Sequence, residues 1–194
     1  MQRNEMQAPV IFTLIRNISI ALLAFVSFPF ASQALGANAM GLYSWANTFV
    51  YYFLIISRLG IPLIAIRECA KVKDDKEALS AKVQSFFVLQ LITSAASFLL
   101  LLIIMFAGRG VVIQENIWNL VFLLSVNFLI GVFSFEWLYI ALDRVFYMSV
   151  RSLAITVFGT LLIIVFVQND HDLYLYAFLN LLAIGITLVY LSIS

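Results

Sequence analysis

The chain has 194 residues, of which 64% are hydrophobic and 11% are charged, with a mean hydropathy of +1.06. This composition excludes an ordinary soluble protein and leaves no stretch long enough for a separate soluble domain. The formal net charge of +1 hides an uneven distribution along the chain. We therefore expect an all-α integral membrane protein.

Apolar segments follow one another through almost the whole sequence. A helix needs about 20 residues to cross the hydrocarbon core of a bilayer. No charged residue occurs from Asn17 to Ser57, so this run requires two crossings, with an external turn at 35–41 and a kink at Pro29. The pattern predicts six transmembrane helices, at about 9–34, 42–66, 83–107, 117–141, 146–167 and 173–193.

Basic residues mark one predicted face of the membrane. They precede or begin the first span and fill the connections after the second and fourth spans, whereas Arg109 alone marks the opposite face. The positive-inside rule then places both termini and the 67–82 connection in the cytoplasm. The mixed-charge run 67–77 is interpreted as a solvated helical connector, with binding to anionic lipid headgroups as the alternative.

Two charges lie inside apolar spans. Arg58 precedes Arg67 by nine residues and Glu136 precedes Arg144 by eight, so both are expected about 12–14 Å from the cytoplasmic surface. A charge at such a depth costs about 3 kcal/mol and usually faces a bundle interior or a wet cavity. Two interpretations stay open and can both hold. The residues form an ion pair that fixes helix register, or they take part in a ligand cavity.

Polar side chains gather on single helical faces. Ser44, Asn47, Tyr51 and Arg58 fall within roughly 80° of one another at 100° per residue. The fourth span has a similar group, which consists of Ser125, Glu136 and Asp143 with Tyr139 at the edge. The third and fifth spans have faces of small polar residues that we interpret as helix–helix packing surfaces. On the third span these residues are Gln90, Ser94 and Ser97, and on the fifth they are Ser149, Ser152, Thr156 and Gly159.

Residues for catalysis or metal binding are scarce. His171 between Asp170 and Asp172 resembles a metal site only in residue type, and a solvated turn is the preferred interpretation. Cys69 is the only cysteine, which excludes an internal disulfide. We expect no enzymatic activity, no metal and no cofactor.

Several short motifs resemble the N-terminal part of Wzx-type polysaccharide flippases, which belong to the polysaccharide-transport branch of the MATE-like (MOP) superfamily. They are Leu35-Gly36, Gly41-Leu42-Tyr43-Ser44-Trp45-Ala46, Leu59-Gly60-Ile61, Arg67-Glu68, Phe135-Glu136-Trp137-Leu138-Tyr139, Ala141-Leu142-Asp143-Arg144, Ser149-Val150-Arg151-Ser152, Phe166-Val167 and Asp172-Leu173-Tyr174-Leu175-Tyr176. Their order and spacing match over most of residues 10–180.

The resemblance implies one lobe of a MATE-like transporter in the bacterial inner membrane. Such proteins flip undecaprenyl-diphosphate-linked oligosaccharide repeat units to the periplasmic leaflet by alternating access, for O-antigen, lipopolysaccharide or other surface polysaccharide. Arg58 would face the diphosphate or an acidic sugar, with Ser44, Asn47 and Tyr51 as further cavity residues. Glu136 would orient Arg58 or couple to a cation, and a cytoplasmic-gate or structural network would comprise Asp143, Arg144 and Arg151.

Partners implied by the resemblance are the lipid-linked oligosaccharide and membrane lipids, with polysaccharide polymerase and chain-length machinery as further candidates and no nucleic acid. Family members have twelve or more spans, so the second lobe is expected to be absent from this chain, and self-association is the alternative. Two other functions stay open: a non-transporting fragment or structural membrane subunit, and a multidrug exporter of the same superfamily.

Overall fold

The structure, a computed structural model, describes residues 2–108, 115–142 and 145–193. Within these ranges all regular elements are helical, which confirms the all-α prediction. The elements are α1 (Gln2–Arg58), α2 (Ile61–Ala70), α3 (Lys76–Gly108), α4 (Glu115–Ser125), α5 (Asn127–Val132), α6 (Glu136–Ala141), α7 (Val145–Phe166), the 3-10 helix η1 (Asp170–Asp172) and α8 (Leu173–Ile193).

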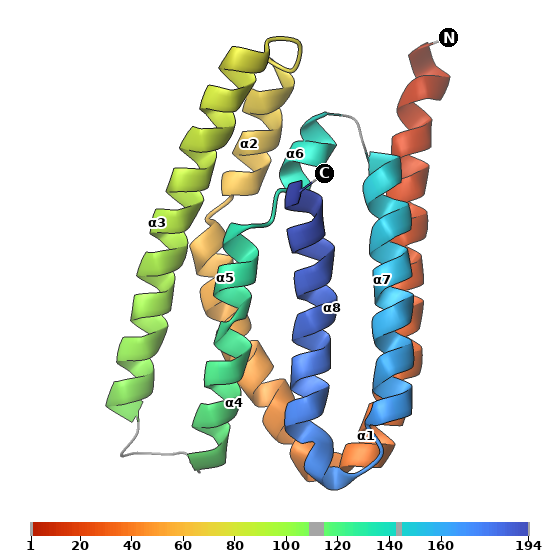
Figure 1. Cartoon of the computed structure of the whole chain (residues 1–194), viewed down its shortest axis with the longest axis vertical. Helices are drawn as coiled ribbons and strands as arrows, with labels where there is room; N and C mark the ends of the chain where they lie inside the picture. The colour runs from red at the N-terminus through yellow and green to blue at the C-terminus, as the bar shows by residue number, and fades with distance from the viewer. Residues whose placement is uncertain (1, 109–114, 143–144, 194) are drawn as a thin grey trace.

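Helix α1 is bent at Gly36. This residue has φ 75° and ψ 165°, a combination that is essentially restricted to glycine. From the N-terminus, α1 descends to the bottom of Figure 1, turns there and rises toward α2. The turn expected at 35–41 is therefore made by one residue between helical arms. Pro29 lies in the first arm, within helical backbone, and a kink there stays a prediction.

Four helical stretches are long and apolar enough to cross a membrane. They are Asn17–Ala70, Lys76–Gly108, Ile117–Ala141 and Val145–Phe166, and Leu173–Ile186 is a shorter apolar helix. The first stretch has 54 residues, far more than the ~20 that one crossing needs. Because the bend at Gly36 turns this stretch back on itself, two crossings fit within it, and the count of six stays a prediction.

Two of the expected spans are interrupted. The second breaks between α1 and α2, where Leu59 and Gly60 have φ angles of 39° and 74°. Pro62 follows in the first turn of α2, a position that proline favours. The fourth breaks at Val126 and again at 133–135. No glycine or proline occupies 133–135, so the sequence carries no local signal for that break.

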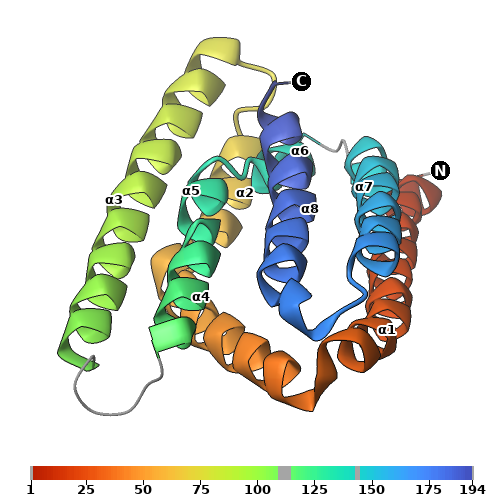
Figure 2. The ribbon, with the colours of Figure 1, turned by 60° about the horizontal axis from the view of Figure 1, so that its bottom comes forward.

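The helices form one bundle in which distant segments meet. Figures 1 and 2 show α8 between the α4–α5 segment and α7, with the second arm of α1 crossing behind. A core cluster joins α1, α3, α4 and α8, and its least exposed members are Ala46, Leu101, Val121 and Ala177. The second arm of α1 is thus anchored by packing on one side.

Small polar residues of α3 and α7 lie at helix contacts, as predicted. Gln90, Ser94 and Ser97 are buried on α3, and the Ser97 hydroxyl donates a hydrogen bond of 2.6 Å to the Phe53 carbonyl of α1. On α7, Gly159 lies so close to α8 that an added Cβ would stand 2.9 Å from the Cβ of Ala183. These faces hold helices together.

Candidate functional site

Arg58 and Glu136 line the same cavity. Its volume is about 100 Å³, space for a few water molecules or a small polar group. The other lining residues come from α2, α3, and the segment from α5 to α6, and they are Pro62, Ile66, Gln90, Gly131, Ser134, Trp137 and Ile140. We call this cavity the polar pocket.

The two charged residues stand at helix breaks. Arg58 is the last residue of α1, directly before Leu59 and Gly60, and Glu136 is the first residue of α6, directly after the 133–135 break. Helix α2 packs against α6, which brings the two breaks to the same pocket. Helix ends release backbone N–H and C=O groups from the helical ladder, so polar backbone accompanies the charged side chains there.

The polar pocket brings the two charges together without a direct bridge. Between residues that the structure describes, the ion pairs within 4.0 Å join Glu68 to Lys71 and to Lys82. Arg58 is exposed and Glu136 is partly buried. Both side chains line one cavity, and the two interpretations that the sequence left open, an ion pair that fixes helix register and a ligand cavity, stay predictions.

Ser44, Asn47 and Tyr51 lie elsewhere. All three are exposed on α1, on the helical face that ends at Arg58, and they do not line the polar pocket. Tyr51 keeps 58% of its surface accessible. Facing hydrocarbon, such a polar stripe would lose its hydrogen bonds to water. In a membrane this face of α1 requires either water or a covering element that supplies polar partners.

The fourth span does not keep the polar face that the sequence predicted. Because the helix is interrupted twice, the 100° periodicity does not carry from Ser125 to Glu136. Ser125 is buried and donates to the Phe122 carbonyl at 2.6 Å, whereas Glu136 lines the polar pocket. Tyr139 is buried against Met148.

The predicted gate residues are only partly described. Asp143 and Arg144 lie outside the described residues. Arg151 on α7 donates a hydrogen bond of 3.0 Å to the Tyr147 hydroxyl, and its guanidinium carbon lies 5.1 Å from the centre of that ring. Tyr147 in turn stacks on Tyr139 of α6 at 6.5 Å. These contacts connect α7 to α6 and fit a structural role for Arg151.

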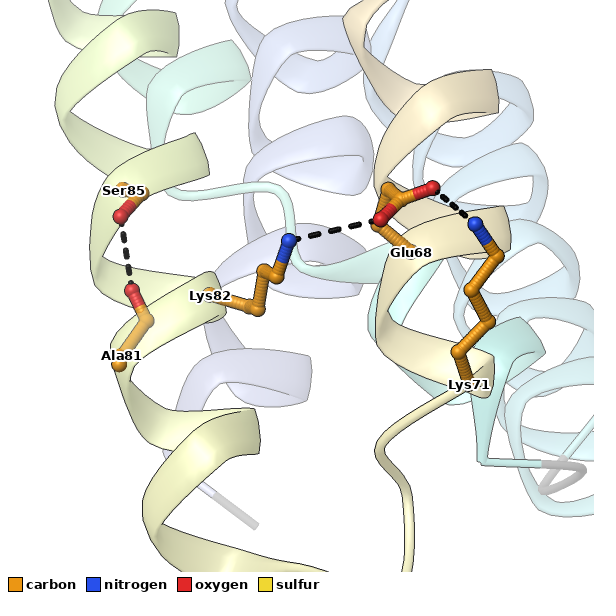
Figure 3. A network of polar contacts seen from close by, with 5 residues as sticks. All are labelled: Glu68, Lys71, Ala81, Lys82 and Ser85. Atoms are coloured by element: carbon orange, nitrogen blue, oxygen red, sulfur yellow. Dashed lines mark hydrogen bonds and ion pairs between the residues drawn. The ribbon is translucent and has the colours of Figure 1, made fainter.

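A charged cluster closes the turn between α2 and α3. Figure 3 shows Glu68 between Lys71 and Lys82, with N–O distances of 2.5 and 3.4 Å. Asp75 accepts backbone hydrogen bonds from Glu77 and Ala78 at 3.0 and 3.1 Å, which satisfies amides at the start of α3. The run 67–77 is thus largely helix and exposed turn, as expected of a solvated connector.

The turn around His171 is held by Asp172. Its Oδ2 accepts the backbone amides of Gln168 and Asn169 at 3.1 and 2.9 Å, and these bonds hold the pKa of Asp172 below its ordinary value. His171 is exposed. Over the part of the chain that the structure describes, no group of three or more His, Cys, Asp or Glu side chains is placed to hold a metal ion.

Three residues of the polar pocket were missed at the level of sequence. Gln90 was grouped with packing residues, and Ser134 and Trp137 carried no assigned role. A signal existed for two of them, since Gln90 is the largest polar residue of its face and Trp137 follows Glu136 directly. Ser134 could not be found, because only the unforeseen break at 133–135 places it there.

Long apolar helices, with a charged pocket where two of them break, define a multi-pass helical membrane protein. The family model for polysaccharide biosynthesis proteins matches residues 8–194, and the chain belongs to this family. Its members act in polysaccharide synthesis and transport. No curated protein and no solved structure matches the chain.

Proposed function

We propose that the chain is one lobe of a flippase that moves undecaprenyl-diphosphate-linked oligosaccharide repeat units across the bacterial inner membrane. The observation that carries this proposal is the polar pocket, which combines Arg58 and Glu136 with Gln90 and Ser134 inside an otherwise apolar bundle. A diphosphate cannot cross about 30 Å of hydrocarbon unaided, and a cation on its path offsets part of the desolvation cost.

The helix breaks support a transport role. In transporters, interrupted membrane helices expose backbone groups where substrates or ions bind, and the lobes rock around that site. Here the α1–α2 and α5–α6 breaks flank one pocket. The carrier function needs no bond-making chemistry, so the proposed protein is not an enzyme. It crosses the membrane six times, with both termini in the cytoplasm.

The exposed polar face of α1 is the proposed boundary of the central cavity. Ser44, Asn47 and Tyr51 lead along this face toward Arg58. A second lobe covers the face and leaves a wet passage between the lobes. Hydroxyl, amide and phenol groups are suited to hydrogen bonding with sugar hydroxyls.

The test replaces Arg58 in a strain that depends on this protein for surface glycan. We expect Arg58→Ala and Arg58→Glu to abolish glycan export while the amount of protein in the membrane stays normal. Lys73→Ala, on the exposed α2–α3 turn, is the matched control and should export normally. Normal export by Arg58→Ala would contradict the proposal.

A structural role for the charged residues makes a different prediction. If Arg58 and Glu136 only fix helix register, the charge exchange Arg58→Glu with Glu136→Arg should restore both protein amount and export. The flippase proposal predicts that the exchange restores protein amount at most, because the cation has moved to another helix. Multidrug export would instead require altered susceptibility to cationic drugs with unchanged glycan.

A further inference from the structure

A second cavity lies beside the polar pocket and has the opposite character. It is a groove of about 280 Å³ between α3 and the α4–α5 segment, and its lining is almost entirely hydrocarbon. Leu91, Ala95 and Phe98 form one wall, and Phe122, Phe128 and Leu129 form the other. We call it the apolar groove.

The two cavities are neighbours along both of their shared walls. Gln90 lines the polar pocket and Leu91 lines the apolar groove, one residue further along α3. On the opposite wall the chain runs the other way, and residues 122–132 of the α4–α5 segment line the groove, whereas residues 131–140 line the polar pocket. Figure 1 shows α3 and the α4–α5 segment adjacent over this length, with the α2–α3 turn at the top. The polar pocket is therefore followed by hydrocarbon-lined space in the direction away from that turn.

The groove has a closed floor and an accessible rim. Phe98 and Phe128 contact each other across it, with ring centres 5.6 Å apart. Phe122 and Leu129 keep 62% and 67% of their surface exposed. The Ser125 hydroxyl already donates a hydrogen bond to the Phe122 carbonyl, so it needs no hydrogen-bond partner from a molecule in the groove. A single flexible hydrocarbon chain suits such a surface.

We infer that the apolar groove binds the polyprenyl tail of a lipid whose diphosphate lies at Arg58 in the polar pocket. This inference rests on the proposed function. With the Lys-rich α2–α3 turn in the cytoplasm, a lipid of the inner leaflet has its head toward that turn and its tail toward the bilayer centre, in the same order as the two cavities. Charge complementarity at Arg58 selects an anionic head.

Depth favours a lipid in transit over a resident phospholipid. Arg58 directly precedes the Leu59–Gly60 break, and the ten residues of α2, which rise about 15 Å at 1.5 Å per residue, separate that break from the charged α2–α3 turn. A phospholipid phosphate rests at the headgroup level and would have to leave it to reach Arg58. A translocated diphosphate must pass this depth. The tail in the groove would hold the lipid during that passage.

The test uses a polyprenyl diphosphate with a diazirine on its tail and the full chain in vesicles of phosphatidylethanolamine and phosphatidylglycerol. After irradiation, we expect label on residues 91–98 and 122–129. Unlabelled polyprenyl diphosphate should compete, an equal amount of phosphatidylglycerol should not, and Arg58→Ala should reduce the labelling. Equal competition by phosphatidylglycerol would show an ordinary bilayer lipid in the groove and overturn the inference, as would label confined to other residues.

A matched pair of substitutions tests the groove in cells. Ala95 and Ala96 are neighbouring exposed residues of α3, and only Ala95 lines the groove. Ala95→Trp should fill the groove and reduce both labelling and glycan export, whereas Ala96→Trp should change neither. Normal export and labelling by Ala95→Trp, at normal protein amount, would overturn the tail site alone. Normal export by Arg58→Ala would instead overturn the proposed function. If Ala95→Trp lowers the amount of protein in the membrane, the photolabelling of the unaltered chain decides whether the groove binds the lipid tail.

Discussion

The helix junctions at the polar pocket and the α7–α8 pair use glycine for opposite reasons. At the α1–α2 junction, Gly60 supplies a φ of 74°, and an added Cβ would meet no atom within 4 Å. On α7, Gly159 is helical, and an added Cβ would stand 2.9 Å from Ala183. The first region gives up helical hydrogen bonds and keeps a charge accessible. The second keeps its helices continuous and closely packed, which identifies it as scaffold.

The largest stability effect is expected at Gly159. Gly159→Ala should lower the free energy of unfolding by about 1–3 kcal/mol, because α7 and α8 must move apart to admit the methyl group. Unfolding of the detergent-solubilised protein by heat or by sodium dodecyl sulfate measures this. Gly41→Ala is the control, since Gly41 is an exposed helical residue with open space around it, and it should be neutral or stabilising. Equal effects of both changes would show that close packing is not what requires Gly159.

At the α1–α2 junction, the stability of Gly60 variants should depend on how readily the new residue adopts a left-handed conformation, and little on the size of its side chain. Gly60→Ala should cost about 1–2 kcal/mol, because a left-handed conformation is unfavourable for alanine. Gly60→Asn should cost less despite its larger side chain, since asparagine visits this conformation more readily. At Gly159 the order should reverse, with Asn worse than Ala. The same unfolding assay compares the four variants, and the same order at both positions would remove the contrast between the regions.

A smaller effect is expected where α3 meets α1 below the polar pocket. Ser97→Ala removes the buried hydrogen bond to the Phe53 carbonyl, and such interhelical bonds in membrane proteins contribute about 0.6 kcal/mol on average. Ser85→Ala is the matched control, because its hydroxyl bonds only to Ala81 of the same helix and is exposed (Figure 3). An effect at Ser85 as large as that at Ser97 would contradict a specific α1–α3 bond.

The smallest effect should be a pH dependence of the turn before α8. The pKa of Asp172 is lowered in the folded state by two backbone amides, so its contribution to stability is present above the ordinary aspartate pKa of about 3.9. It is lost as pH falls through the lowered folded value. Asp172→Asn should therefore flatten the acid limb of a stability–pH curve. An unchanged acid limb would mean that other carboxylates determine it.

Sequence reasoning found the features that depend on composition and local pattern. The apolar runs gave helices long enough to span a membrane, and the buried serines of α3 followed from helical periodicity. The placement of Arg58 and Glu136 near one another was predicted from their similar expected depth, because charges in hydrocarbon are costly enough to be conspicuous, and both line the polar pocket. Gly36 lies in the turn expected at 35–41, although the sequence did not show that this one residue suffices for the turn. The left-handed conformation of Gly60 was not predicted.

By itself the sequence determined the helical class and the likeness to polysaccharide biosynthesis proteins, and it predicted two charges within the membrane. Only the tertiary structure decided that the fourth span breaks at 133–135, because packing of α6 against α2 overrides local helix preference there. That break brings Ser134 and Trp137 to Arg58 and separates Ser125 from Glu136. Adjacency of the polar pocket and the apolar groove was equally invisible, since it depends on how α3 lies against α5. Side-chain pattern along one helix carries no information about which neighbour covers it.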